Sequence, residues 1–110
     1  MRRFLVGLLV VMAPALAQAN EAHDALVKMT DLQRNYAFAK FMEASGERCP
    51  QVTRNMFQGF DKKKNAFWSL TCYDGQSWSV MIYNDAKGSS RILECSVLKA
   101  VGGGQCFKKF

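Results

Sequence analysis

The sequence contains little of the side-chain chemistry on which most enzymes rely. His23 is the only histidine among 110 residues, and it stands near the expected start of the exported chain, where we predict a frayed terminus. A Ser-His or Cys-His nucleophile system would have to be built on this one mobile side chain. The scarcity of histidine therefore argues against a nucleophilic hydrolase and favours a protein that is not an enzyme.

Motifs that hold metals or cofactors are missing too. The four cysteines include no Cys-x-x-Cys pair, which excludes the common zinc, thioredoxin-like and c-type haem motifs. The glycine run at residues 102–104 is not followed by the Lys-Ser or Lys-Thr of a phosphate-binding loop. We therefore predict neither a metal site nor a cofactor.

Long apolar runs are absent after residue 19, and the run before it is typical of a secretory signal peptide. Two arginines precede an apolar stretch over residues 4–12, and a small-x-small cleavage motif ends at Ala19. No later segment has the roughly 20 apolar residues that a transmembrane helix needs. We predict a signal peptide at residues 1–19 and a single small domain over residues 20–110, in the periplasm or secreted. An uncleaved membrane anchor is the alternative.

The charge is modest. The formal net charge is +6, and it falls to +4 when the two arginines of the signal peptide are removed. A charge of this size serves solubility and does not indicate a nucleic-acid partner. Two lysine clusters, Lys62–Lys64 and Lys108–Lys109, are candidates for weak contact with an anionic surface such as lipid headgroups or polysaccharide. We expect the clusters at opposite ends of the molecule, where each would act alone.

The first part of the exported chain has the pattern of an amphipathic helix. No proline or glycine interrupts residues 21–44, and a break is expected near Thr30 or Asp31, either of which could cap a second segment. Arg34 and Lys40 are expected on the outer side. Apolar residues recur at spacings of three and four, which predicts a stripe that packs on a sheet: Leu26, Met29, Leu32, Tyr36, Ala39 and Met42.

Residues 66–85 have the alternation of two strands around a tight turn. A two-residue loop at Asp74-Gly75 would place the large apolar side chains of the two strands on opposite faces of the sheet. A three-residue loop over 73–75 instead pairs Leu70 with Trp78 and keeps one face apolar. The pattern therefore predicts a hairpin with the three-residue loop, in which Trp68 also pairs with Val80.

Two outer strands complete the predicted sheet. We expect the first strand over residues 52–60 and the fourth over residues 91–98. A four-residue loop at 85–88 would join the central hairpin to the fourth strand. That loop would pair Val80 with Leu93. The predicted fold class is α+β, with an N-terminal amphipathic helix packed on one face of a four-stranded antiparallel β-meander.

The four cysteines allow three pairings, and the meander favours one of them. Cys72 and Cys95 would have the third strand between them, and two strand spacings of about 4.8 Å exceed the usual Cα separation of a disulfide. The sequence therefore predicts the disulfides Cys49–Cys72 and Cys95–Cys106. Two disulfides also agree with an oxidising compartment.

The sheet face away from the helix is the predicted binding surface. Apolar anchors stand there among serines and threonines, a pattern typical of the core of a protein interface. Glu94 would project from the same face, next to Ser77 and Ser79. The predicted binding residues are Phe67, Met81, Tyr83, Ile92 and Glu94.

The resulting hypothesis is a non-enzymatic binding or accessory domain that contacts a periplasmic or envelope protein. Three alternatives stay open. The face could be merely solvated, with its aromatic side chains stabilising the sheet as cross-strand pairs. The lysines could bind an anionic surface. The third alternative, a small hydrolase using Glu94 with neighbouring hydroxyls, has less support because a lone carboxylate lacks a partner for acid–base work.

Overall fold

The computed structural model describes residues 20–102 and 104–110, so the predicted signal peptide lies outside the described residues. The elements follow in the order α1 (Glu21–Val27), α2 (Asp31–Ala44), β1 (Val52–Phe60), β2 (Ala66–Cys72), β3 (Ser77–Ile82), β4 (Ser90–Glu94) and α3 (Cys95–Ala100). The four strands form one antiparallel sheet in the order β1-β2-β3-β4. The predicted α+β fold is confirmed.

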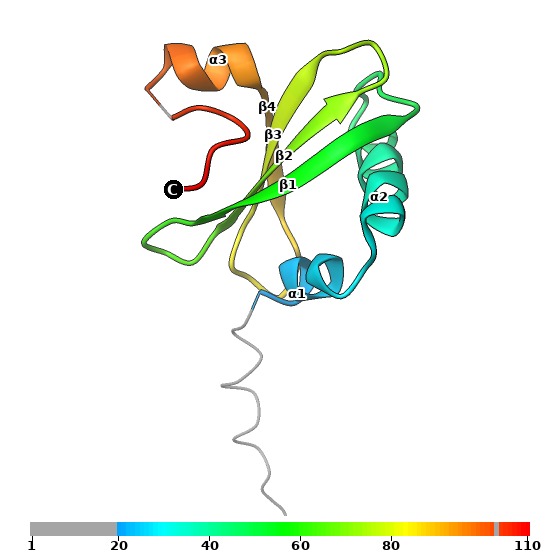
Figure 1. Ribbon diagram of the computed structural model, residues 1–110. Coiled ribbons are helices and arrows are strands. Elements are labelled where there is room, and N and C mark those ends of the chain that lie inside the picture. The colour runs from blue at the N-terminus through cyan, green and yellow to red at the C-terminus, as the bar shows by residue number, and fades with distance from the viewer. Residues whose placement is uncertain (1–19, 103) are drawn as a thin grey trace, which may run out of the picture.

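The sheet has a layer on each face. Helices α1 and α2 pack on one face, and α3 with the C-terminal segment lies on the other (Figure 1). The main core lies between the sheet and the first two helices and includes Trp68, Leu70, Val80, Phe38 and Met42. No helix in residues 20–102 or 104–110 is both long enough and apolar enough to cross a membrane.

The predicted break in the N-terminal helix is confirmed, with Thr30 as the cap. The Thr30 hydroxyl accepts a hydrogen bond from the Gln33 backbone N–H at 3.2 Å. The Gln33 side chain in turn accepts one from the Thr30 N–H at 2.9 Å, which completes a capping box. This reciprocal pair satisfies two N–H groups that a helix start otherwise leaves unpaired, so α2 begins as a separate helix.

The buried face of α2 differs from the predicted stripe. Phe38 and Met42 are buried, whereas Leu32 and Tyr36 are exposed to 80% and 68%. At 3.6 residues per turn, the ten positions from Leu32 to Met42 do not amount to a whole number of turns, so these two residues lie on different sides of α2. The bulky side chains of Phe38 and Phe41 pack in and against the core instead, and Leu32 and Tyr36 stay outside it.

The central hairpin has the predicted register. Leu70 pairs with Trp78 and Trp68 pairs with Val80. Gly75 has φ +89°, the left-handed conformation that the three-residue loop requires.

The register of β4 is one residue away from the prediction. Val80 pairs with Ile92 rather than Leu93, because Tyr83 donates its N–H to the Ser89 carbonyl at 2.8 Å and leaves five residues in the loop. The Asp85 carboxylate accepts the N–H groups of Lys87 and Ser89 and so organises this longer loop. The strand ends at Glu94, and the predicted strand residues 95–98 belong to α3 instead.

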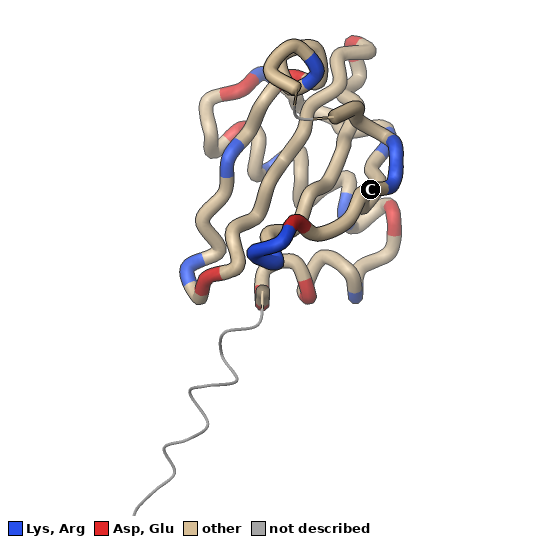
Figure 2. The backbone as a smooth tube through the Cα atoms, turned by 90° about the vertical axis from the view of Figure 1, so that its left-hand side faces the viewer, with Lys and Arg blue, Asp and Glu red and all other residues tan. Residues whose placement is uncertain are grey.

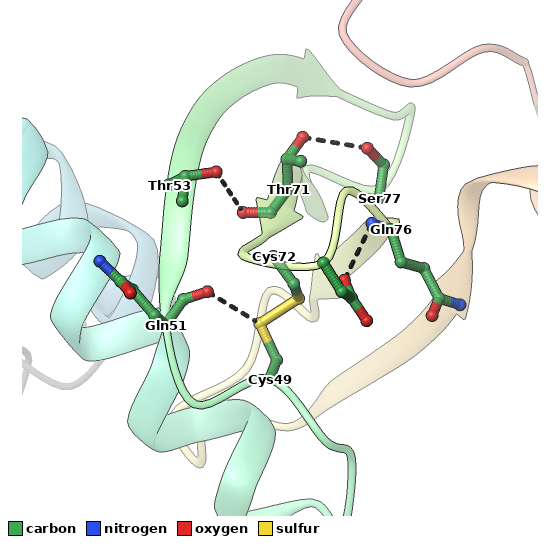
Figure 3. Close-up of a disulfide and its surroundings, with 8 residues drawn as sticks. Cys49, Gln51, Thr53, Thr71, Cys72, Gln76 and Ser77 are labelled. Carbon is green, nitrogen blue, oxygen red and sulfur yellow. Dashed lines mark hydrogen bonds between the residues drawn. A yellow bond between two sulfur atoms is a disulfide. The ribbon is translucent and has the colours of Figure 1, made fainter.

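Both predicted disulfides are confirmed. Cys49–Cys72 joins the chain that leaves α2 to the end of β2, with a Cα separation of 5.5 Å (Figure 3). Cys95–Cys106 joins the start of α3 to the C-terminal segment, with a Cα separation of 5.8 Å. The four cysteines leave no free thiol.

Candidate functional site

The sheet face that we predicted to be open is covered. Ser69 and Ser79, expected in an exposed polar field, are exposed to only 0% and 4%. The Ser69 hydroxyl accepts the Phe107 N–H at 3.0 Å, and Leu98 of α3 is buried on the same side. The prediction was wrong because the glycine run suggested a loose tail, whereas the C-terminal segment docks on the sheet.

Gln58 holds the C-terminal segment in place. Its buried side-chain amide donates hydrogen bonds to the carbonyls of Gln105 at 2.7 Å and Lys108 at 3.0 Å. The backbone carbonyl of Gln58 accepts the Phe110 N–H at 3.2 Å. Gly59 lets the tail approach closely, because a Cβ there would lie 3.0 Å from the Phe110 ring.

The structure does not bring the five predicted binding residues together. Phe67 and Met81 share the covered face and line a small cavity beneath α3, and Tyr83 is half-buried just beyond β3. Ile92 packs against the core on the α1–α2 side instead. Glu94 pairs with Trp78 on that side and accepts a hydrogen bond from Gln76. The shifted register of β4 explains both displacements, because one residue of slip moves every side chain to the other face.

His23 is buried rather than frayed. The Trp68 indole N–H donates to its Nδ1 at 3.0 Å, and the rings of Phe57 and Phe60 lie 4.5 and 4.9 Å from the imidazole, centroid to centroid. Desolvation by burial lowers the pKa of His23, and the nearby Asp24 carboxylate only partly opposes this shift. Its spacing of three from the core residue Leu26 is the sequence signal that we missed.

This histidine environment suits structural support better than catalysis. An imidazole whose Nδ1 already accepts the indole proton is held in one tautomer among aromatic rings. Across residues 20–102 and 104–110, no group of three or more histidine, cysteine, aspartate and glutamate side chains could hold a metal ion.

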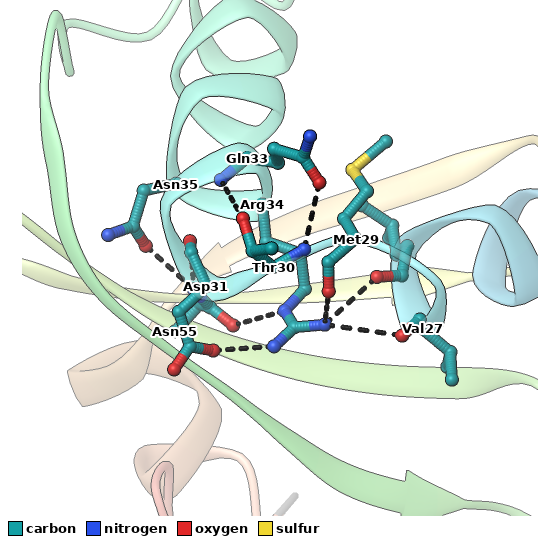
Figure 4. A network of polar contacts seen from close by, with 9 residues as sticks. Val27, Met29, Thr30, Asp31, Gln33, Arg34, Asn35 and Asn55 are labelled. Carbon is teal, nitrogen blue, oxygen red and sulfur yellow. Dashed lines mark hydrogen bonds and ion pairs between the residues drawn. The ribbon is translucent and has the colours of Figure 1, made fainter.

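Arg34 connects the N-terminal end of α2 to α1 and β1 through hydrogen bonds (Figure 4). We expected its side chain on the outer side of the helix, but it is half-buried. Its guanidinium donates to the carbonyls of Leu26 at 3.0 Å and Met29 at 2.7 Å, and it forms an ion pair with Asp31. It also donates to Asn55 Oδ1 of β1 at 3.0 Å. One side chain thus ties α1, α2 and β1 together.

The outer side of α2 presents two large apolar side chains on this fixed helix. Leu32 and Tyr36 lie one turn apart, and the Lys40 ammonium lies 5.5 Å from the centre of the Tyr36 ring. Two shallow grooves flank the pair, one bounded by Met29 and Ala37 and the other by residues 51–53 with Asn35 and Ala39. We call Leu32, Tyr36 and the walls of these grooves the α2 surface.

Comparison of the chain with protein-family models, with curated proteins and with solved structures found no match.

Proposed function

We propose that this protein is a small exported, non-enzymatic domain that binds a protein partner through the α2 surface. The observation that carries the proposal is the high exposure of Leu32 and Tyr36 on one rigid helix. Aromatic side chains are enriched in the core of protein interfaces, where a polar rim surrounds them. Gln33, Asn35 and Lys40 supply polar groups around the pair.

The rigidity of α2 favours binding. The capping box and the Arg34 contacts fix the helix before any partner arrives. A contact surface that is already ordered loses less conformational entropy on association, so more of the burial energy appears as affinity. Leu32 and Tyr36 contribute little to the core of the free protein, so contact with a partner explains these two residues better than stabilisation of the fold.

The buried histidine and the position of Glu94 support a role other than catalysis. The hydrolase alternative placed Glu94 beside Ser77 and Ser79, but the carboxylate lies on the opposite face of the sheet and is engaged by Gln76. The two disulfides support export to an oxidising compartment.

Co-purification tests the proposal. Tagged wild-type protein is compared with the double variant Leu32→Asp/Tyr36→Asp and with the matched control Val101→Asp, which changes an exposed apolar residue away from α2. Exposed substitutions of this kind change stability by about 0.5 kcal/mol or less, and unfolding curves check this. We expect a partner with wild type and control but not with the double variant. The same partners on all three proteins would refute the α2 surface.

A second candidate function, contact with an anionic surface, gains support from the path of the tail. The lysine clusters were expected at opposite ends of the molecule, but Phe110 bonds to Gln58, three residues before the Asp61 that opens the Lys62–Lys64 loop. Figure 2 shows the side of the molecule that carries both the C-terminal segment and the Lys62–Lys64 loop, with acidic residues among the basic ones. We expect weak vesicle binding that falls when ionic strength rises from low to physiological. Binding that is insensitive to salt would contradict it.

A further inference from the structure

The two edges of the sheet are protected unequally. The ladder between β1 and β2 has irregularities at Val52–Arg54 and at Phe57–Gly59, and the tail bonds to the Gln58 carbonyl. Bulges and covering segments are the usual means by which proteins prevent an edge strand from pairing with another chain. Strand β1 is therefore a poor template for a further strand.

Strand β4 forms the other edge and has none of this protection. All five of its residues pair with β3 without a register shift. Among the described residues, no backbone hydrogen bond joins its outer side to another segment. It lies at the far margin of the sheet from β1 (Figure 1).

The register shows which backbone groups face outward. The Tyr83 N–H donates to the Ser89 carbonyl, so this pair belongs to the hydrogen-bonded class of an antiparallel ladder. Alternation then makes Arg91 and Leu93 bond inward to β3, while the N–H and C=O groups of Ser90 and Ile92 point to the open edge. The edge thus presents two donors and two acceptors at the spacing of a strand.

A cavity lies on each face beside this edge. The cavity on the α1–α2 side has a volume of about 310 Å³, is lined by apolar side chains such as Leu26, Phe41 and Ile82, and reaches Ser90. The cavity on the α3 side has a volume of about 210 Å³ and is lined by Phe67, Met81, Leu93 and Leu98, with Arg91 in its wall.

The larger cavity suits a side chain of a peptide better than a free small molecule. Small-molecule sites combine apolar walls with a few polar groups that fix the orientation of the ligand. In the part of the chain that the structure describes, Ser90 gives the larger cavity its only polar side chain. The outward backbone groups of β4 supply the missing orientation, but only to a ligand that is itself an extended backbone.

We propose that the β4 edge binds an extended segment of another protein as a fifth, antiparallel strand. Its main chain bonds to Ser90 and Ile92, and side chains on its two faces enter the two cavities, as in other cases of strand addition. The residue opposite Ser90 is apolar, the residue opposite Arg91 is acidic, and the residue opposite Leu93 is apolar. The site includes neither Leu32 nor Tyr36, although Met29 and Ala37 line both the larger cavity and one groove of the α2 surface.

A second copy of this chain fits the edge less well. Full antiparallel pairing of two β4 strands centred on Ile92 places the Glu94 carboxylate of the second copy opposite Ser90, against an apolar cavity. Moving the centre of pairing to Arg91 sets two guanidinium groups directly opposite each other, which is unfavourable. A partner with its own sequence avoids both conflicts.

Selection from a phage-displayed library of random linear peptides tests the proposal. The purified disulfide-bonded domain is the target, and the affinity of the selected peptides is measured by fluorescence anisotropy for wild type, for Ser90→Pro and for the control Lys62→Pro. Proline at position 90 removes an outward N–H without removing a bond to β3. The control places a proline in the exposed turn between β1 and β2, outside the proposed site. We expect the selected peptides to share the apolar-x-acidic-apolar pattern. Their binding should weaken roughly tenfold with Ser90→Pro, the lost bond adding to the clash of the ring, and stay unchanged with Lys62→Pro.

A second variant keeps the test decisive if Ser90→Pro does not fold. Arg91→Glu reverses an exposed charge and should weaken the same peptides, while selection on this variant should favour basic residues in place of acidic ones. Failure to enrich peptides, equal binding to the variants, or a concentration-dependent dimer lost in Ser90→Pro would overturn the proposal. None of these outcomes depends on Leu32 or Tyr36, so this experiment tests the β4 edge independently of the proposed function of the α2 surface.

Discussion

At the scale of single residues, His23 shows how a local rule fails. Its place near a chain terminus suggested fraying, but Asn20 caps α1 and also donates to the Ile82 carbonyl at 3.1 Å. This anchor holds the helix start against the sheet, so His23 enters the cluster of Trp68 and Phe57. A terminus tied down by side-chain bonds does not fray.

The lowered pKa of His23 predicts a loss of stability in mild acid. Because burial lowers its pKa below the usual 6.5, the unfolded chain takes up the proton more readily than the folded one. The stabilising contribution is therefore complete above the usual pKa and is lost as pH falls from there through the lowered value. Protonation also removes the acceptor for the Trp68 indole. Urea unfolding at about pH 8 and about pH 5 should show the difference.

The variant His23→Phe should remove this part of the pH dependence. At about pH 8 it leaves the Trp68 N–H without its partner, which should lower the free energy of unfolding by about 1–3 kcal/mol. The difference in unfolding free energy between the variant and wild type should shrink as pH falls. An unchanged difference across the range would show that His23 does not titrate as its surroundings indicate.

At the scale of elements, the sequence predicted the features that depend on the alternation of apolar and polar residues along a strand. The hairpin of β2 and β3 followed from alternation, because only one loop length keeps Leu70 and Trp78 on the same face. The register of β4 depended on the loop before it. The Asp85 carboxylate accepts the Ser89 N–H and organises a loop of five residues, one longer than predicted. Periodicity does not reveal such a side-chain bond. The binding residues Ile92 and Glu94 were misplaced for the same reason.

Arg34 gives a direct test of how α2 is held. Arg34→Lys keeps the charge but loses the planar fork that reaches Leu26, Met29 and Asn55 at once. We expect the free energy of unfolding to fall by about 1.5–3 kcal/mol, the value of hydrogen bonds to a charged group. The control Lys40→Met removes an exposed charge and should change stability by about 0.5 kcal/mol or less. Equal small effects would mean that the Arg34 contacts do not hold α2.

At the scale of the whole molecule, contacts between distant parts of the chain decided which surface stays open. Gln58 and Gln105 are joined by a side-chain bond that no local pattern indicates. The disulfides were predictable because sheet geometry limits which cysteines can meet, yet the docking of the tail along the sheet was not. The open sheet face was therefore predicted wrongly, and the exposed side of α2 was missed.

The two disulfides should contribute similar stability. Their loops span 23 and 11 positions, so the chain-entropy model gives each about 3 kcal/mol, slightly more for Cys49–Cys72. Cys49→Ser/Cys72→Ser should therefore destabilise the domain somewhat more than Cys95→Ser/Cys106→Ser in urea unfolding. The reverse order would contradict this account.

The Cys95→Ser/Cys106→Ser variant should also keep its tail on the sheet. The Phe107 N–H bonds to Ser69 and the Phe110 N–H bonds to Gln58, and neither bond requires the disulfide. Hydrogen exchange should therefore show both amides still protected. Immediate exchange at both would mean that the disulfide alone holds the segment.

The most direct measurement of the central claim is site-specific photo-crosslinking in cells that produce the full 110-residue chain. A photoreactive amino acid replaces Leu32 or Tyr36 on the α2 surface, and Lys99 on the exposed side of α3 serves as the control position. The account predicts a discrete adduct with the same partner protein from positions 32 and 36, and none from position 99. No adduct from the α2 positions, or the same adduct from all three, would contradict it.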